Sequence, residues 1–382
     1  MKNRSKKYAE AIGLKDTTEI NMARRTTLGA FCALGATAMM PMRVSAAERI
    51  KIGYLPVNAM TSIYTEAAGS WNNEKYSAEL VRLRGGPAIV QGIQGGSLQA
   101  GECAVTVLMS LASQGIPIIC LASCNNATTE APYNRIMVAK DSPLKSVSEL
   151  KGKTIGILAL GTLDHVQLLA ALKKAGIGLN EVKIVSIPVP NQPQALASGQ
   201  VDAMVMPPPA DIISIQQNGA RMLADATDAL PYYPLEVLLA SETWANENPD
   251  AARLLVAAWL KTNRWIEAHP DKARSVARDF LGLPEEISTQ VRMPRWAKNA
   301  LPVMPGVWNL YYAMSNNGLI KPVDDPQAMM IRYFIEPARK YVLPALESLG
   351  MVEDEATDSL NKIALSFLPK GPEQYVTSWS KS

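Results

Sequence analysis

The groups in this sequence that could do chemistry are suited to holding a small anion. Gly85 and Gly86 form a pair that lets a backbone approach a bound molecule closely. Thr162 stands directly before an apolar helical pattern, and the N–H groups of Leu163 and Asp164 could bind a carboxylate, sulfonate or nitrate oxygen. Two simpler interpretations stay open: the glycines only make a tight turn, and Thr162 only caps the helix.

The residues around this helix start also restrict the ligand. The carboxylate of Asp164 would repel an anion in the first turn, and a protonated His165 would offset that charge. A lone histidine is as readily an ordinary polar residue of the surface or core. Met109, Met206 and the prolines at 207–209 predict a partly apolar pocket, which favours an organic sulfonate, an aromatic acid or a pyrimidine over nitrate.

The sequence offers little for catalysis or metal binding. It has no Gly-rich phosphate loop, no Ser-His-Asp arrangement and no metal motif, and its two histidines are His165 and His269. Cys103, Cys120 and Cys124 follow the leader described below, and the last two lack a His or Cys partner at ligand spacing. We interpret all three as small buried hydrophobic residues rather than a metal site, and a disulfide among them stays open. We predict no catalytic residue, no cofactor and no metal.

Residues 1–46 have the features of an export signal. They carry eight Lys and Arg against three Asp and Glu, and an apolar stretch at 28–42 precedes a small-x-small pattern that predicts cleavage near Ala46 and Ala47. The pair at 24–25 resembles a twin-arginine signal, but Thr27 stands where that signal usually has Phe, so Sec export stays open. An amphipathic N-terminal helix of a cytoplasmic protein is the simpler alternative.

The composition of the whole chain is that of a globular protein large enough for two domains. Of its 382 residues, 48% are hydrophobic and 19% charged. Because the leader has a net charge of +5 and the whole chain +3, the rest of the chain has a net charge of −2, which gives no basic surface for nucleic acid. No later apolar stretch approaches the roughly 20 residues of a membrane span. We therefore predict an exported protein with no nucleic-acid partner.

Short apolar runs alternate with helical patterns, which predicts an α/β fold with mostly parallel sheets flanked by helices. Extended segments stand at 134–140, between two series of runs, and at 235–240, after the second series. Helical patterns cover 163–175, about 248–268, and 325–343. The first series of predicted strands is 50–54, 79–83, 104–108 and 116–121, and the second series is 154–158, 183–187 and 201–206.

The two series also resemble each other. Residues 91–100 align without gaps on residues 194–203. In each copy a helix would end at a glycine, Gly96 or Gly199, and a strand would then begin. Chance similarity over so short a stretch is the alternative, but the order of strands and helices around the copies matches as well. Two lobes of like construction follow.

Three segments together resemble one known family. They are residues 50–56, 144–156 and 197–203, and their order and spacing agree over roughly 50–270. Behind an export signal, they resemble the periplasmic solute-binding proteins of the nitrate, sulfonate and taurine type, which include thiamine-pyrimidine binders. The resemblance implies the two-lobed type II periplasmic binding protein fold. It also implies a monomer that captures a small organic anion or an aromatic or heterocyclic solute and delivers it to the permease of an ABC transporter.

The resemblance also divides the chain and places the site. Residues 47–138 would form the first part of lobe one, 139–233 lobe two, and 234–382 the rest of lobe one with the C-terminal helices. An open parallel sheet binds ligands beyond the carboxyl ends of its strands, which selects the same loops. The predicted ligand-binding residues are Leu55, Pro56, Val57, Asn58, Gly85, Gly86, Met109, Ser110, Ser123, Asn125, Gly161, Thr162, Leu163, His165, Pro188, Asn191, Met206 and Pro207.

Two other functions would suit a similar sequence. A ligand-sensing subunit that reports to a membrane receptor would share all of these features. Pyrimidine-synthesising enzymes resemble the family but use a cysteine-rich run with iron and histidine, which the scattered cysteines here do not provide. The family often has an acidic residue before the proline that follows the last strand of lobe two. This chain has Met206 before Pro207, a departure that bears on the ligand more than on the fold.

Overall fold

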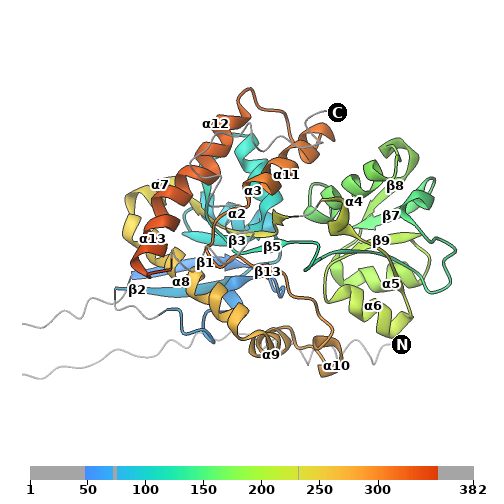
Figure 1. Ribbon diagram of the computed structural model, residues 1–382, viewed down its shortest axis with the longest axis horizontal. Helices are drawn as coiled ribbons and strands as arrows, with labels where there is room; N and C mark the ends of the chain where they lie inside the picture. The colour runs from blue at the N-terminus through green and yellow to red at the C-terminus, as the bar shows by residue number, and fades with distance from the viewer. Residues whose placement is uncertain (1–47, 72–74, 231, 352–382) are drawn as a thin grey trace, which may run out of the picture. The chain divides into compact units, whose positions relative to one another are not determined.

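The computed structural model describes residues 48–351, apart from 72–74 and 231. The predicted export signal and its cleavage site at Ala46 and Ala47 lie outside these residues. The described chain forms two five-stranded sheets and a small three-stranded sheet, with helices packed around them (Figure 1). The predicted α/β class is confirmed.

The first sheet combines the start of the chain with one strand from much later in the sequence. Its strand order is β2-β1-β3-β12-β4. β1 pairs in parallel with β2 and β3, whereas β12 runs antiparallel between β3 and β4. The strands are β1 (Glu48–Tyr54), β2 (Tyr76–Arg82), β3 (Ala100–Ala104), β4 (Ile118–Ser123) and β12 (Glu236–Ser241).

The second sheet repeats this plan with the order β10-β6-β9-β7-β8. β7 pairs in parallel with β8 and β9, and β6 runs antiparallel between β9 and β10. The sheet includes residues 135–138, which the predicted boundaries place in the segment 47–138. The strands are β6 (Arg135–Val138), β7 (Thr154–Ile157), β8 (Lys183–Ser186), β9 (Ala203–Met206) and β10 (Arg221–Asp225).

A third, short sheet is built from three strands that are far apart in the sequence. Its strands are β11 (Tyr233–Pro234), β5 (Asn125–Ala127) and β13 (Arg295–Trp296), all antiparallel. Only Cys124 separates β4 from β5, and only Leu235 separates β11 from β12. Three segments that are far apart in the sequence therefore meet beside the end of the first sheet.

Helices cover the faces of both large sheets. Figure 1 shows α4 on one side of the second sheet and α5 and α6 on the other. Within the described ranges no helix is long and apolar enough to cross a membrane. The α-helices are α2 (Gly86–Gln94), α3 (Val105–Ser113), α4 (Leu163–Lys174), α5 (Gln192–Ala197), α6 (Ala210–Asn218), α7 (Glu242–Glu247), α8 (Pro249–Ala268), α9 (Pro270–Leu281), α10 (Glu285–Ser288), α11 (Met304–Asn316), α12 (Pro326–Met330) and α13 (Leu343–Ser348).

Shorter helical turns complete the chain. Two π-helical turns, η6 (Ile331–Ile335) and η7 (Ala338–Val342), stand between α12 and α13. The 3₁₀ turns are η1 (Thr61–Tyr64), η2 (Val147–Leu150), η3 (Leu179–Glu181), η4 (Val189–Asn191) and η5 (Ala226–Ala229). The C-terminal helical pattern at 325–343 is thus confirmed as a nearly continuous helical stretch.

The internal repeat is confirmed, and one predicted strand is wrong. Gly96 and Gly199 have φ values of 73° and 74°, and β3 and β9 follow them. The observed strand β3 ends at Ala104, so the rest of the strand predicted at 104–108 is instead the first turn of α3. Its β-branched residues imitate a strand, whereas the true strand contains a glycine. A side chain at Gly101 would meet Ile89 Cγ2 at 2.3 Å, so close packing of α2 requires that glycine.

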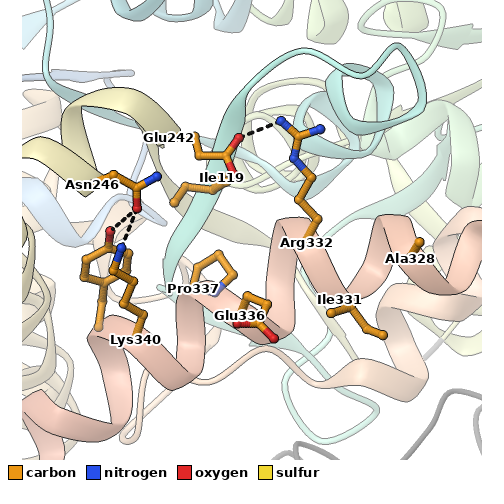
Figure 2. A pocket seen from close by; sticks show the side chains of 10 residues that line it. Ile119, Glu242, Asn246, Ala328, Ile331, Arg332, Glu336, Pro337 and Lys340 are labelled. Carbon is orange, nitrogen blue, oxygen red and sulfur yellow. Dashed lines mark hydrogen bonds and ion pairs between the residues drawn. The ribbon is translucent and has the colours of Figure 1, made fainter.

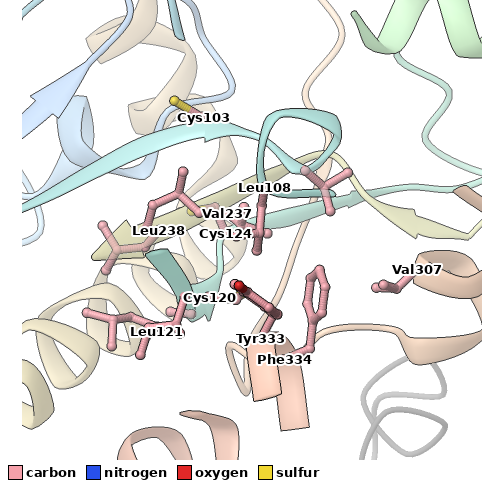
Figure 3. Close-up of a cluster of buried hydrophobic side chains, with 14 of the residues drawn as sticks. Cys103, Leu108, Cys120, Leu121, Cys124, Val237, Leu238, Val307, Tyr333 and Phe334 are labelled. Atoms are coloured by element: carbon pink, nitrogen blue, oxygen red, sulfur yellow. The ribbon is translucent and has the colours of Figure 1, made fainter. Parts of the chain in front are cut away.

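The largest hydrophobic core lies around the first sheet and includes the C-terminal helices. Figure 3 shows Tyr333 and Phe334 packed near Leu108 and Val237. Cys103, Cys120 and Cys124 belong to this core, are buried and are not disulfide-bonded. The interpretation of these cysteines as small buried hydrophobic residues is confirmed.

The contact between α11 and β11 provides a test of this packing. A Cβ atom at Gly306 would lie 2.0 Å from the carbonyl oxygen of Tyr232 and 2.5 Å from Cα of Tyr233. Since both obstacles are backbone, we expect Gly306→Ala to lower the free energy of unfolding by about 1–3 kcal/mol or more, measured by urea unfolding. Ser315→Ala in the same helix is the control and should change it little. Equal stability of the two variants would contradict this packing.

Candidate functional site

The structure places most predicted site residues at the carboxyl ends of the strands, as expected. Leu55, Pro56 and Val57 are half-buried between β1 and η1, and Gly85 and Gly86 begin α2. Gly161, Thr162, Leu163 and His165 surround the start of α4, Met206 ends β9 and Pro207 follows it. Pro188 and Asn191 are exposed in the loop after β8, whereas Asn58, Ser123 and Asn125 are fully buried.

The structure does not place Met109 and Ser110 in a loop after a strand. Both lie within α3, and Met109 is fully buried in the core of the first sheet. They were predicted as ligand-binding residues because a strand was expected to end at residue 108. Because the chain turns into a helix at Val105, these residues follow the strand end by more than one helical turn.

Asn58 connects the loop after β1 to two other segments. Its side-chain oxygen accepts a hydrogen bond from the Tyr133 hydroxyl at 2.9 Å, and its amide donates to the Arg292 carbonyl at 2.9 Å. Its own carbonyl accepts from the Tyr64 hydroxyl at 2.7 Å. Since all four groups are buried or half-buried, these bonds hold the loop in one position.

Asn125 holds the same loop from the other side. Its amide donates to the Ala59 carbonyl at 2.6 Å, and its side-chain oxygen accepts the Glu236 N–H at 3.3 Å. The carbonyl of Ser123 accepts from the Asn263 amide at 3.4 Å. The structure therefore brings Asn58, Ser123 and Asn125 to one end of the first sheet, where these hydrogen bonds join them to other parts of the chain.

Glu102 is the central acceptor at this end of the sheet. Its carboxylate accepts the backbone N–H groups of Thr61 and Ser62, each at 2.8 Å, and the indole N–H of Trp259 at 3.2 Å. The residue is fully buried. Three donors on η1 and α8 compensate the cost of burying this carboxylate.

Glu236 is a second buried carboxyl near Glu102. Strand pairing sets Glu236 opposite Ala104 and Leu238 opposite Glu102, so both carboxyls project from the same face of the sheet. Oε2 of Glu236 has no hydrogen-bond partner. Burial and, less strongly, the neighbouring Glu102 raise the pKa of Glu236 well above its usual range.

A buried ion cluster lies at the start of α6. Oδ2 of Asp211 is 2.8 Å from Nη1 of Arg292 and 3.3 Å from Nη1 of Arg135. Arg135 also lies 3.8 Å from Asp225, and Arg292 donates from Nε to the Pro132 carbonyl at 3.0 Å. The cluster joins β6 and α6 of the second sheet to the segment before β13. Two guanidinium groups and two carboxylates balance its charge.

The start of α4 differs from what the sequence predicts. Thr162 accepts no capping hydrogen bond; its hydroxyl instead donates to the Ala159 carbonyl and to Asp164. The Asp164 carboxylate also accepts the Leu158 N–H. Nδ1 of His165 accepts the Gly161 N–H at 3.0 Å, and burial lowers the pKa of His165. An accepting Nδ1 requires a neutral ring, so His165 does not offset the charge of Asp164.

The sequence leaves open whether Tyr64, Tyr232 and Tyr233 stack on an aromatic solute or pack within the protein, and the structure gives each of them contacts with the chain. Tyr233 is fully buried and its hydroxyl accepts from the Gln167 amide, while Tyr64 packs edge-to-face on Trp296 at 5.4 Å between ring centroids. Tyr232 bonds Glu130 at 2.8 Å. These contacts favour the packing interpretation over a ring-stacking role.

A pocket of about 450 Å³ lies elsewhere, beside α7 and the π-helical turns (Figure 2). Glu242 and Arg332 form an ion pair of 2.7 Å across it, and Lys340 donates to Asn246. No predicted site residue lines this pocket. It is therefore a feature of the first sheet's outer edge and separate from the strand ends that the sequence selected.

Sequence reasoning missed Glu102, Glu236, Asp211 and Arg292. The signal for the first two was a single acidic residue within an otherwise apolar strand, a pattern that requires buried partners. Asp211 and Arg292 are far apart in sequence, and their pairing has no local signal. Among the residues with described placement, no group of three or more His, Cys, Asp or Glu could hold a metal ion.

Removing the Asp211 carboxylate should destabilise the protein strongly. Asp211→Ala leaves Arg135 and Arg292 facing each other without a shared partner, so we expect a loss of about 3–5 kcal/mol in the free energy of unfolding. Asp225→Ala removes only a partly exposed contact and should cost about 1 kcal/mol or less. Urea unfolding of both variants measures the difference, and similar losses would show that the cluster does not depend on Asp211.

The raised pKa of Glu236 predicts a pH-dependent stability. The folded state keeps its proton at pH values where the unfolded state, with the usual pKa near 4.5, has lost it. The stability linked to this group is thus full below about pH 4.5 and declines as the pH rises. Glu236→Gln should therefore gain melting temperature over the wild type between pH 4.5 and 7.5, about 2–4 °C per kcal/mol. Exposed Glu66→Gln is the control; parallel pH profiles for Glu236→Gln and the wild type would refute the assignment.

Comparison with known proteins places this geometry in context. Residues 90–273, from α2 into α9, match the family model described as NMT1/THI5 like. A protein of Brucella abortus (strain 2308) that is named as a binding protein is 28% identical over 265 residues, which are 68% of this chain and 79% of the relative.

Two solved structures have the same fold. The periplasmic nitrate-binding protein NrtA from Synechocystis PCC 6803 matches with a TM-score of 0.65 at 14% identity, over 81% of this chain and 90% of that chain. The periplasmic aliphatic sulphonate binding protein SsuA from Escherichia coli matches with a TM-score of 0.62 at 18% identity, over 77% of this chain and 92% of that chain. These two matches confirm the periplasmic binding protein fold. The family-model match and relatives from Escherichia coli (strain K12) named as sulfonate- and taurine-binding proteins confirm the resemblance to the solute-binding proteins of the nitrate, sulfonate and taurine type.

Proposed function

We propose that this protein is an extracytoplasmic solute-binding protein that captures a small molecule and delivers it to the permease of an ABC importer. The observation that carries the proposal is a pair of similar sheets whose strand ends are connected by buried polar residues. The chain as a whole also resembles such binders. The solute classes that follow from the resemblance are a small organic anion or an aromatic or heterocyclic molecule.

The proposal includes location and organisation. The leader at 1–46 supports export by the twin-arginine or Sec route with cleavage near Ala46 and Ala47. Lobe one would comprise 47–138 and 234–382, built on the first sheet, and lobe two 139–233. A monomer is sufficient for this function, because each chain contains both sheets.

Solute binding would work by closure of the two lobes. A ligand that touches both lobes stabilises the closed arrangement by its higher affinity for that state, and a permease can recognise the closed surface. No bond of the solute has to change. Among described residues, the buried carboxyl of Glu102 and the buried hydroxyls of Tyr64 and Tyr233 form hydrogen bonds within the chain, which supports binding rather than catalysis.

A ligand screen tests this function. We expect a true solute to raise the melting temperature of the purified protein, since a ligand at 100 times its dissociation constant adds about 2.7 kcal/mol of stability. After prolonged incubation, mass spectrometry of the recovered molecule should show an unchanged mass. Consumption of the molecule would instead support an enzyme, and binding to a receptor but not to a permease would support a sensor.

A further inference from the structure

We propose that residues 282–292, here called the bridging segment, hold the strand ends of the two large sheets together, so that the protein favours its closed arrangement before any solute binds. The inference rests on the lobe closure of the proposed function and names the contact that controls it. It follows from where the bridging segment begins and ends, what it contacts between, and which strand ends its last residue joins.

Both ends of the bridging segment are fixed to the first sheet. Before it, Ala273 and Ala277 of α9 are buried in one cluster with Tyr64 of η1, and α9 ends at Gly282, which has a φ of 63°. After it, Met293 packs against the same cluster. The bridging segment therefore leaves the first sheet and returns to it within a few residues.

Between these ends the bridging segment contacts the second sheet. Ile287 of α10 and Val291 form a separate buried cluster with Ile212 of α6, and each of the three side chains is 4% exposed. The amide of Gln216, also on α6, donates a hydrogen bond to the carbonyl of Glu286 at 3.1 Å. Because α6 follows β9 directly along the chain, this contact joins the helices of one sheet to those of the other.

Arg292, the last residue of the bridging segment, joins the carboxyl ends of β1 and β9. Its carbonyl accepts the amide of Asn58, in the loop after β1, at 2.9 Å. Its Nη1 lies 2.8 Å from Oδ2 of Asp211, in the first turn of α6 after β9. Its Nε donates at 3.0 Å to the carbonyl of Pro132, in the chain between β5 and β6. One side chain thus contacts the second sheet and a segment that leads from one sheet to the other.

These contacts favour closure because of where they lie. The carboxyl ends of the strands are the ends that an open sheet uses for ligands, and contacts between the two sets of ends break when the sheets separate. Contacts made in only one of two arrangements shift the equilibrium toward that arrangement. Separation would not leave Asp211 without a partner, because Arg135 of the second sheet remains 3.3 Å from its Oδ2. The contact with Arg292 can therefore break without isolating a buried carboxylate.

The experiment measures the distance between the two sheets without any solute. Spin labels are attached to the double variant Arg84→Cys and Leu160→Cys, which lie in the loops after β2 and β7. Both positions are exposed, and β2 is the edge strand of the first sheet farthest from β12 and β4. The natural cysteines among the described residues are buried, so the introduced thiols react selectively. Pulsed electron paramagnetic resonance gives the distribution of label distances.

Two changes to the bridging segment are compared in this labelled protein. Arg292→Met removes the guanidinium while Arg135 still pairs with Asp211, and we expect the distribution to move to longer distances. Ile287→Ala leaves Arg292 in place and weakens the buried contact with α6, so we expect a smaller move in the same direction. Circular dichroism establishes that each variant is folded.

Arg264→Met is the matched control. Arg264 is a half-buried arginine of α8 that donates to the carbonyls of Lys298 and Met351, at 3.1 and 3.2 Å, and it should leave the distances unchanged. Unchanged or shorter distances in folded Arg292→Met, or in Ile287→Ala if the first variant does not fold, would overturn the inference. Since no solute is present, that result would leave the proposed function standing, and the ligand screen tests that function separately.

Discussion

The structure depends most on how it buries carboxylates at the ends of its strands. Glu102 lies in the middle of an apolar core, where an unpaired carboxylate would cost several kcal/mol. It is tolerated because η1 and α8 supply N–H donors from two directions. The same bonds fix where the chain turns after β1, so the position of that loop and the burial of the acid are one requirement.

That requirement extends along the chain to the second sheet. The loop held by Glu102 places Asn58, which binds Tyr133 and the carbonyl of Arg292. The side chain of Arg292 in turn pairs with Asp211 on α6. A continuous set of hydrogen bonds and ion pairs thus leads from β3 to α6. Movement of one sheet against the other would have to break or exchange these contacts.

The sequence predicts the fold well because local patterns determine most of it. The glycines at 96 and 199, the helical period of 163–175 and all but one of the apolar runs are local patterns that the structure confirms. The prediction of a strand at 104–108 was wrong for two reasons. The β-branched residues at the start of α3 resemble a strand, and the closely packed Gly101 inside the true strand suggests a break. Most of the loops were located correctly for the same reason, since they follow strands, but the one assigned to Met109 and Ser110 lies within α3.

The contents of the site could not be predicted in this way, because they depend on contacts between distant residues. Asp164 is visible in the sequence, but only the structure shows that its carboxyl accepts the N–H of Leu158, which lies before α4. Glu102 and Thr61 are some forty residues apart, and only the fold shows that the acid takes the donors of the loop. The resemblance to anion binders therefore carries over to the backbone more securely than to the chemistry of recognition.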